Sequence, residues 1–268
     1  MKAYRILTQS TIEPFERSVL DCSVLNKSLA NLQEEILEEA GFSLVVEPPS
    51  DEEYLIFTDR MYFSLTLLEK IKLGGQGQLV CRNEKWNQNM SSVLSAKDGK
   101  YEIAIVKGDP SFAELEELEI DWELREGDEM KVHSAFHHAL RPMMVGACLA
   151  FSIGHWTDLI RVNQLALLEK AERIRYQWKR NGLWFRIYLL FHFLFKIRSI
   201  NKQKIARRIG TEGKNCKIHP TAIVEACEIG DNVEIGAYSV IRASVIGDGA
   251  KIEEHVTMLL SVLGKNTR

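Results

Sequence analysis

The feature that most constrains the fold is a six-residue periodicity in the last quarter of the chain. Aliphatic residues recur at every sixth position, at Ile223, Ile229, Ile235 and Ile241, and the pattern resumes at Ile246 and Ile252. Glycines follow aliphatic residues at Gly230, Gly236 and Gly247. This period fits neither an amphipathic helix nor an alternating strand. It predicts a three-sided parallel β-helix with one short strand per hexapeptide and three strands per coil.

The first 110 residues alternate short apolar strands with helical patterns. Strands are predicted at Ala3–Leu7, Phe42–Val46, Tyr54–Thr58, Gln78–Arg82 and Glu102–Lys107, and helices at Ser28–Ala40 and Phe63–Leu73. Gly41 is a typical residue after a helix end. This alternation favours an α/β domain with a largely parallel sheet.

Composition narrows the function classes. The chain has 268 residues, of which 46% are hydrophobic and 26% charged, and its net charge is −3. These are ordinary values for a globular protein, and they argue against a generally basic nucleic-acid binder. The five cysteines form no CxxC pair, no secretory signal opens the chain, and no run of about 18 apolar residues occurs. We therefore expect a cytoplasmic protein with reduced thiols and without nucleic-acid partners.

Charge is unevenly distributed along the chain. Nine acidic residues and one basic residue lie between Ser111 and Met130, whereas thirteen basic and two acidic residues lie between Lys170 and Lys214. The acidic stretch is either a solvated face or a docking surface. From about His155 to Arg208 the sequence is typical of helix, with an interruption near Asn181-Gly182.

The last 50 residues, which open with Ile218-His219-Pro220-Thr221-Ala222-Ile223-Val224, resemble the left-handed β-helix of hexapeptide-repeat proteins. Acyltransferases carry this repeat, and so do sugar-1-phosphate nucleotidyltransferases with an appended β-helix. About three coils fit before Arg268, and since a terminal coil normally needs a cap, we expect the repeat to be cut short there.

The N-terminal half resembles the nucleotidyltransferases of the sugar-pyrophosphorylase family. Ser23 to Phe42 (SVLNKSLANLQEEILEEAGF) has the spacing of the family phrase PVxGKPLIEHxLExLxxAGI. Phe57-Thr58-Asp59 falls where the family has a strand that ends in a metal-binding aspartate. His155 to Asn163 (HWTDLIRVN) resembles the phrase with which some members of the family enter a linker helix. The resemblance implies an α/β fold. Its parts are a Rossmann-like sheet domain of the nucleotide-diphospho-sugar-transferase type at 1–154, a helical, basic and aromatic linker at 155–210, and a short left-handed parallel β-helix at 211–268.

The resemblance also implies site residues. Lys27 and Asp59 would be catalytic, with Asp59 holding Mg²⁺, and Thr8, Gln9 and Arg17 would lie in the nucleotide-binding loop. That loop departs from the family pattern, because Thr8 to Arg17 contains no glycine and carries Glu13 and Glu16. Glycines let backbone N–H groups approach phosphates closely. The N-terminal domain therefore looks degenerate, and Mg²⁺ is expected only if catalysis is retained. Apart from the resemblance, Asp59 is interpreted as a helix N-terminal carboxylate beside Arg60, and Lys27 as a surface lysine.

Three functions follow as alternatives. The first is a sugar-1-phosphate nucleotidyltransferase acting on a nucleotide and a sugar phosphate, the second a non-catalytic scaffold or sugar-nucleotide-binding relative, and the third a hexapeptide acyltransferase. For the third, His255 is a candidate base. The resemblance to hexapeptide proteins implies a homo-oligomer, most commonly a trimer.

Two further patterns can be interpreted either as ordinary secondary structure or as a ligand-binding site. His133, His137 and His138 are spaced for a metal on a helix, but also fit a strand. Gly74 to Gly77 follows a helix and precedes a strand, so we interpret it as a turn and not as a phosphate loop.

The segment Leu183–Ile197 has twelve apolar or aromatic residues of fifteen, with basic flanks. It is too short to span a bilayer. It is either a buried linker helix or an interfacial helix making peripheral contact with the inner membrane face.

Overall fold

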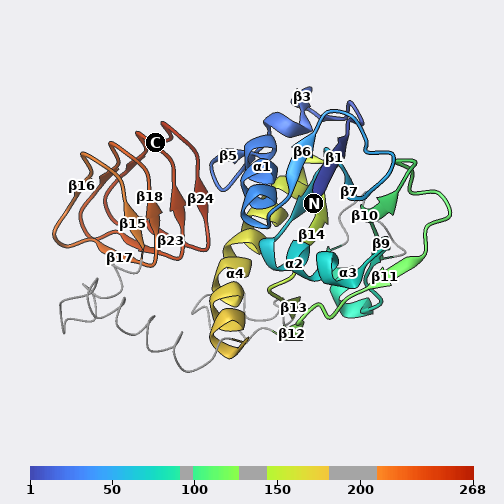
Figure 1. Cartoon of the computed structure of the whole chain (residues 1–268). Coiled ribbons are helices and arrows are strands. Elements are labelled where there is room, and N and C mark those ends of the chain that lie inside the picture. Colours follow the sequence, from blue (N-terminus) through green and yellow to red (C-terminus); the bar gives the residue numbers. More distant parts are fainter. Residues whose placement is uncertain (91–98, 127–143, 181–209) are drawn as a thin grey trace. The chain divides into compact units, whose positions relative to one another are not determined.

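Two units make up the chain, Met1–Arg173 and Ile174–Arg268, and each is described by itself. The computed structural model describes residues 1–90, 99–126, 144–180 and 210–268 (Figure 1). Helix α4 (Trp156–Arg180) runs across the boundary between the units. The expected three-part division stays a prediction, because most of the linker lies outside the described residues.

A six-stranded mixed sheet forms the centre of the first unit (Figure 1). Its strand order is β11 (Glu117–Glu119), β9 (Gly77–Val80), β10 (Lys100–Lys107), β7 (Glu53–Thr58), β1 (Lys2–Ile6) and β6 (Ser43–Val45). The pairs β1–β6, β1–β7 and β11–β9 are parallel, whereas β10 is antiparallel to both of its neighbours. The prediction of a largely parallel sheet therefore holds except at β10.

Short elements surround this sheet. They are β2 (Thr11–Ile12), β3 (Arg17–Ser18), the 3-10 helix η1 (Val19–Asp21), β4 (Ser23–Val24), β5 (Lys27–Ser28), β8 (Met61–Phe63), α3 (Glu84–Met90), β12 (Arg125–Glu126), β13 (Met144–Val145) and β14 (Ala150–Ser152). β2 pairs with β3, β4 with β5, β12 with β13 and β14 with β8, all antiparallel.

Serine caps fix the starts of the first two helices. Ser28 accepts a hydrogen bond from the N–H of Asn31 at the start of α1 (Leu29–Glu39). Ser64 does the same for Leu67 in α2 (Leu65–Gly74). The predicted helix start at Phe63 is wrong, because Met61–Phe63 instead pairs with β14 as β8. An apolar run of that length gives no periodicity by which strand and helix can be told apart.

The turn predicted at Gly74 to Gly77 is confirmed. Gly75 follows α2 with φ +85°, and Gly77 opens β9 with φ +136°. A Cβ on Gly77 would lie 2.9 Å from the carbonyl oxygen of Glu116. The backbone of β11 therefore passes too close here for any side chain.

The acidic stretch is described as far as Glu126, and there it forms ion pairs. Arg82 contacts Glu117 at 3.0 Å and Glu119 at 3.4 Å. Lys70 contacts Glu123 at 3.4 Å. These contacts tie the edge strand β11 and the chain after it to the neighbouring elements.

Helix α4 begins at Trp156, as the sequence predicts. The Asp158 carboxylate accepts hydrogen bonds from the N–H groups of Gly154 and His155, both at 2.9 Å, and so satisfies donors that the helix start leaves open. Further along, Asn163 contacts the β4–β5 hairpin through the N–H of Leu25 at 2.8 Å and the carbonyl of Ser23 at 3.3 Å.

The second unit contains a coil of parallel strands on three sheets. The four-stranded sheet is β15 (Thr211–Glu212), β18 (Glu228–Ile229), β21 (Val245–Ile246) and β24 (Val262–Leu263). The other two are β16 (Lys217–Ile218), β19 (Glu234–Ile235) and β22 (Lys251–Ile252), and β17 (Ile223–Glu225), β20 (Val240–Arg242) and β23 (Thr257–Leu259). Within each sheet, every strand but the last pairs with the strand 17 residues further along, for example Ile229 with Ile246. A coil of 17 residues cannot hold three full hexapeptides, so one side of each coil is shorter than the other two. The break in the six-residue period after Ile241 falls on that side.

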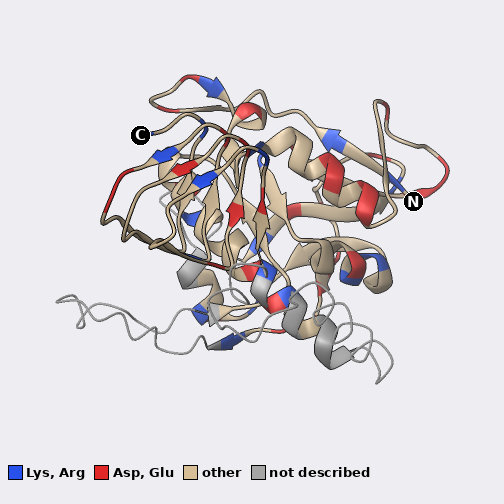
Figure 2. Cartoon of the chain, turned by 90° about the vertical axis from the view of Figure 1, so that its left-hand side faces the viewer, with Lys and Arg blue, Asp and Glu red and all other residues tan. Residues whose placement is uncertain are grey.

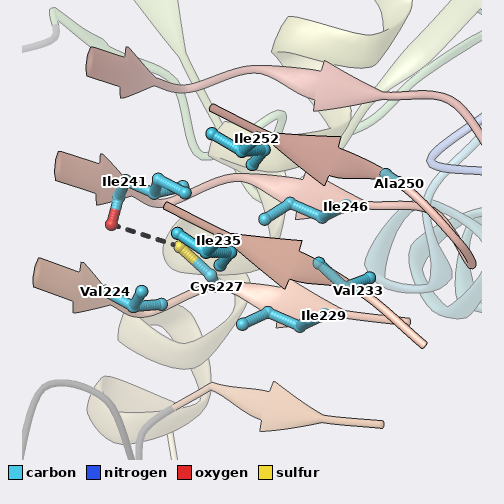
Figure 3. Packing of buried hydrophobic residues seen from close by; sticks show 9 residues of the cluster. All are labelled: Val224, Cys227, Ile229, Val233, Ile235, Ile241, Ile246, Ala250 and Ile252. Atoms are coloured by element: carbon cyan, nitrogen blue, oxygen red, sulfur yellow. Dashed lines mark hydrogen bonds between the residues drawn. The ribbon is translucent and has the colours of Figure 1, made fainter. Parts of the chain in front are cut away.

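Five of the six predicted aliphatic positions point into this coil (Figure 3). The prediction at Ile223 is wrong by one residue, because Val224 is the residue that pairs with Ile241 and is buried there. Ile229, Ile235, Ile246 and Ile252 are all buried, and Ile241 is fully buried. The buried Cys227 thiol contacts the carbonyl of Ile241 at 3.4 Å. On the outside, Glu234 lies between Lys217 and Lys251 at 2.9 Å from each, so charges alternate from coil to coil (Figure 2). These two ammonium groups hold the pKa of Glu234 at about 2.

The remaining features noted in the sequence are the cysteines, the histidine cluster and the apolar segment. The five cysteines are all free thiols. His133, His137, His138 and the segment Leu183–Ile197 lie outside the described residues. Within the described ranges, no helix is long and apolar enough to cross a membrane.

Candidate functional site

The candidate site lies where β1 and β7 end side by side. The chain leaves β1 for α1 and β6 on one side, and then returns as β7 on the other side of β1. The two strands are parallel, and their last paired residues are Ile6 and Thr58. Ligands of open α/β sheets bind at such a change of direction, outside the carboxyl ends of the strands. This edge of the sheet is therefore the first place to look for a site.

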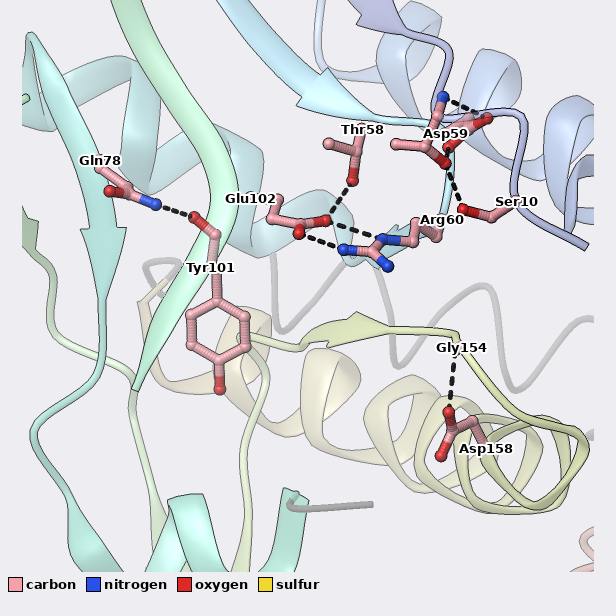
Figure 4. Close-up of polar contacts among 10 residues, drawn as sticks. Ser10, Thr58, Asp59, Arg60, Gln78, Tyr101, Glu102, Gly154 and Asp158 are labelled. Carbon is pink, nitrogen blue, oxygen red and sulfur yellow. Dashed lines mark hydrogen bonds and ion pairs between the residues drawn. The ribbon is translucent and has the colours of Figure 1, made fainter. Parts of the chain in front are cut away.

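Asp59 joins the two strand ends. Its N–H donates to the carbonyl of Ile6 at 2.9 Å. Its carboxylate accepts from the hydroxyl of Thr8 at 2.6 Å and from the N–H of Thr8 at 3.0 Å. The Thr8 hydroxyl lies 2.7 Å from that of Ser10 (Figure 4). With 3% exposure, Asp59 is buried, and both of its oxygens have partners.

Arg60 points away from Asp59 and towards β10 (Figure 4). Its Nε donates to Glu102 at 3.0 Å, and its Nη2 donates to the other oxygen of the same carboxylate. The Thr58 hydroxyl also donates to Glu102, at 2.7 Å. The hydrogen bond from Arg60 to Glu102 raises the pKa of Arg60 further above its usual range. The result is a planar, two-point ion pair, which holds a guanidinium better than a single contact.

The turn that carries Asp59 and Arg60 is fixed from beneath. Gln33 of α1, with 1% exposure, donates to the carbonyl of Asp59 at 3.0 Å and to that of Met61 at 2.7 Å. The N–H of Ile153, just after β14, donates to the carbonyl of Arg60 at 2.9 Å. Three consecutive carbonyls thus have protein donors, and the turn has one backbone conformation.

The structure brings Thr8 and Asp59 together but gives Lys27 a different partner. Lys27 lies on the β4–β5 hairpin and forms an ion pair with Glu35 of α1. Gln9 is exposed with φ +54°, and Arg17 is exposed on β3, opposite Ile12. The interpretation of Asp59 as a helix N-terminal carboxylate is wrong, because Asp59 lies in the turn between β7 and β8, and α2 begins only at Leu65.

The donors around Asp59 also bear on a metal. Among the residues that the structure describes, no group of three His, Cys, Asp or Glu side chains is placed to hold a metal ion. Mg²⁺ needs free oxygen ligands, whereas the Asp59 oxygens accept from Thr8 and those of Glu102 accept from Arg60 and Thr58. The residues at this edge therefore do not fit a resident Mg²⁺ site.

His255 lies at a corner of the β-helix. Its ring stacks on that of Tyr238, one coil earlier, with centroids 5.2 Å apart and an angle of 13° between the planes. Both residues have positive φ, and Tyr238 is 61% exposed. The N–H of Tyr238 donates to the Thr221 hydroxyl at 3.0 Å. This corner therefore carries two exposed, stacked rings.

The sequence did not identify Gln33 or Glu102 as residues of the site, and it did not predict that Arg60 contacts Glu102. A buried glutamine among the apolar positions of α1 was a usable signal, because a fully buried amide needs partners. Glu102 gave no such signal, since it is 42 residues from Arg60 and only strand pairing brings them together.

One comparison with known proteins bears on the second unit. Residues 213–243 and 226–259 match the family model described as bacterial transferase hexapeptide (six repeats). The parallel strands fit a left-handed β-helix, in agreement with the prediction from the sequence. The C-terminal unit thus carries hexapeptide repeats. No curated protein matches the chain.

Proposed function

We propose that this protein is a nucleotidyltransferase-like relative that binds a sugar nucleotide or sugar phosphate without transferring a nucleotidyl group. The observation that carries the proposal is the contact between Thr8 and Asp59, which closes the ends of β1 and β7 where a ligand of this sheet would lie. The hydroxyl groups of Thr8 and Ser10 and the guanidinium of Arg60 supply polar contacts beside it.

The proposal of binding without turnover is supported by the state of the two expected catalytic residues. In-line attack of a sugar phosphate on an α-phosphate requires positive charge at the phosphates. Lys27 instead forms an ion pair with Glu35, and the Asp59 carboxylate is taken up by Thr8. The loop from Thr8 to Arg17 also lacks glycine. If the chain is active as a nucleotidyltransferase after all, Mg²⁺ would be its cofactor.

A binding screen tests this function. Wild type is titrated with UDP, ADP, GDP, CDP and dTDP, with their glucose conjugates and with glucose 1-phosphate, each with Mg²⁺ and with EDTA. A pyrophosphate-release assay follows on every ligand that binds. We expect binding without pyrophosphate release. Release would show a working nucleotidyltransferase, and failure of all the ligands to bind would reject the proposed function.

A matched pair of variants locates the binding. Ser10→Tyr places a ring at the carboxyl edge of the sheet beside Thr8, whereas Ser43→Tyr places the same ring at the opposite edge, on the first residue of β6. We expect at least a tenfold loss of affinity in Ser10→Tyr and none in Ser43→Tyr. Equal affinity in both would place the ligand elsewhere.

Acyl transfer is the second candidate, and the position of His255 favours it. The ring is exposed at a corner and fixed by stacking on Tyr238, which suits a general base that takes a proton from a hydroxyl or amine. Acetyl transfer from acetyl-CoA to an amino sugar, lost in His255→Ala and kept in His219→Ala, would support this function over the first.

The β-helix is proposed to assemble the protein as a homotrimer, since closed symmetric assembly covers the flat sides of such prisms. Light scattering that shows a monomer at micromolar concentrations would contradict this.

Peripheral membrane contact through Leu183–Ile197 also stays a proposal. Flotation with anionic vesicles, lost in the double variant Phe191→Glu with Phe195→Glu, is its test.

A further inference from the structure

We propose that Arg60, in place of a metal ion, supplies the positive charge that meets a ligand phosphate at the carboxyl edge of the sheet, and that Glu102 is the residue that positions it. The inference deepens the proposed function and rests on it for the identity of the phosphate ligand. It starts from the opposite orientations of the neighbouring side chains Asp59 and Arg60.

The backbone of Arg60 is held more firmly than a surface turn requires. Gln33 binds the carbonyls on both sides of it, and Ile153 binds its own carbonyl. Because Gln33 is buried and also accepts from Arg5 at 3.2 Å, this arrangement is part of the packed interior. A side chain that starts from a fixed backbone loses less conformational freedom when it binds a ligand.

The side chain of Arg60 is fixed on one side and accessible on the other. The contacts to Glu102 use Nε and Nη2. A guanidinium has five N–H donors in one plane, so the Nη1 side keeps donors for a ligand. The side chain is 32% exposed. Arginine suits phosphate because its planar donors match two phosphate oxygens.

The Glu102 carboxylate holds the Arg60 guanidinium in this orientation and balances its charge. The carboxylate accepts from Arg60 on both oxygens and from Thr58 on one of them, so these three hydrogen bonds orient it towards Arg60. Asp59 is buried and turned to Thr8. Of the two neighbouring side chains Asp59 and Arg60, only the positively charged arginine is therefore accessible. A metal-binding aspartate would need the opposite arrangement, with its carboxylate accessible.

The experiment measures anion binding without metal. Wild type in EDTA is titrated with inorganic pyrophosphate and with the five nucleoside diphosphates by calorimetry, and the ¹⁵N–¹H signal of the Arg60 Nε is followed by NMR. We expect binding that EDTA does not change, with a shift of the Arg60 signal. Arg60→Gln should weaken it at least tenfold. Arg60→Lys, which keeps the charge, should retain part of the affinity and so show that the turn still folds.

The control is Arg242→Gln, since Arg242 forms a comparable ion pair with Glu225 at 2.6 Å on the β-helix. It should bind as wild type does. Two variants test Glu102: Glu102→Leu and Glu102→Gln both remove the charge, but only the glutamine keeps an acceptor for Arg60. We expect a loss of fivefold or more in the first and less than twofold in the second, measured at a temperature at which both variants are folded.

The outcomes separate this inference from the proposed function. Nucleotide binding that EDTA abolishes, or that Arg60→Gln leaves unchanged, would overturn the role of Arg60 and keep the function. Binding of pyrophosphate alone, lost in Arg60→Gln, would keep the role of Arg60 and reject the nucleotide ligand. A wild type that binds neither pyrophosphate nor any nucleotide would overturn both.

Discussion

Thr8 gives both its backbone N–H and its hydroxyl to the carboxylate of Asp59, at 3.0 and 2.6 Å. The two residues are 51 positions apart in sequence and follow neighbouring parallel strands. The contact closes the first loop of the sheet onto the end of β7. It gives Asp59 a structural task at the position where the resemblance to nucleotidyltransferases implies a metal ligand.

The first prediction concerns this contact. Asp59→Asn places an amide N–H₂ group against one of the two Thr8 donors, and so removes one of the two hydrogen bonds to a buried carboxylate. We expect the free energy of unfolding of the first unit to fall by about 1–3 kcal/mol. Urea unfolding followed by tryptophan fluorescence measures it, since Trp86 and Trp122 are both buried in that unit.

The exposed Asp51 provides the control, and Asp51→Asn should change stability by less than about 0.5 kcal/mol. A metal-binding Asp59 predicts the opposite pattern, in which Asp59→Asn keeps its stability and loses Mg²⁺-dependent turnover. An unchanged unfolding curve for Asp59→Asn would therefore contradict the structural role.

The second prediction concerns Gln33. Gln33→Leu keeps the size of the side chain but leaves the carbonyls of Asp59 and Met61 without their donor. Unpaired buried polar groups cost about 1–3 kcal/mol each, so for two carbonyls we expect a loss of roughly 2–6 kcal/mol in the same unfolding measurement. Gln76→Leu, at a glutamine that makes an exposed contact to Glu53, should be nearly neutral. Equal effects of the two substitutions would show that Gln33 does not hold the turn.

The third prediction is a pH dependence from Glu169 on α4. Glu169 is 6% exposed, and burial raises its pKa from 4.5 to about 7, against the opposing effects of Arg173 and Lys170 and with a small contribution from Glu39. Tyr62 and Cys148 also lie close enough for the charge of Glu169 to raise their pKa values. In the part of the chain that the structure describes, Oε1 of Glu169 has no hydrogen-bond partner.

Because the folded pKa of Glu169 is raised, its folded form holds a proton that the unfolded form releases above pH 4.5. The contribution of Glu169 to stability is therefore largest below pH 4.5 and falls until about pH 7. A rise from 4.5 to about 7 corresponds to roughly 3 kcal/mol. Glu169→Gln should lose this slope and be more stable than wild type at pH 8, whereas Glu47→Gln, at an exposed site, should follow wild type. Parallel pH curves for wild type and Glu169→Gln would refute the prediction.

The fourth prediction compares two glycines of the β-helix. A Cβ on Gly247 would lie 2.6 Å from the backbone N of Lys265 in the next coil, so Gly247→Ala should destabilise the unit by about 1–3 kcal/mol. Gly249 has φ +67°, and the residues 17 positions before and after it, Asn232 and Asn266, have φ +57° and +54°. A Cβ on Gly249 would lie 2.4 Å from Oδ1 of Asn266, the end of an exposed side chain that can rotate away, unlike the backbone atom that Gly247 faces. Gly249→Asn should therefore be close to neutral, because asparagine tolerates this conformation. Hydrogen exchange of residues 210–268 measures both, and a neutral Gly247→Ala would show that the coils can separate.

Periodicity and end signals were enough to predict most elements of this protein. A six-residue repeat of aliphatic side chains places one residue per short strand inside a coil, so the repeat alone assigns Ile229, Ile235 and Ile246 to a core, where all three are buried. The helix predicted at Ser28–Ala40 from its periodicity and from Gly41 is present as Leu29–Glu39. These signals are local, and each is complete within one or two turns of chain.

The tertiary structure alone decided what the polar residues do. The sequence places Asp59 at a strand end, but its partner Thr8 follows β1 and is 51 residues away in sequence. The partner of Arg60 lies on β10, 42 residues away. Strand order and register set those pairs, including the antiparallel direction of β10 that brings Glu102 opposite Thr58. Residue spacing does not encode which strands become neighbours, because that choice depends on burying the whole sheet at once. The sequence therefore places Asp59 and Arg60 at the end of a strand, and the packing of the sheet decides that the aspartate is bound by a threonine and the arginine is held by a glutamate.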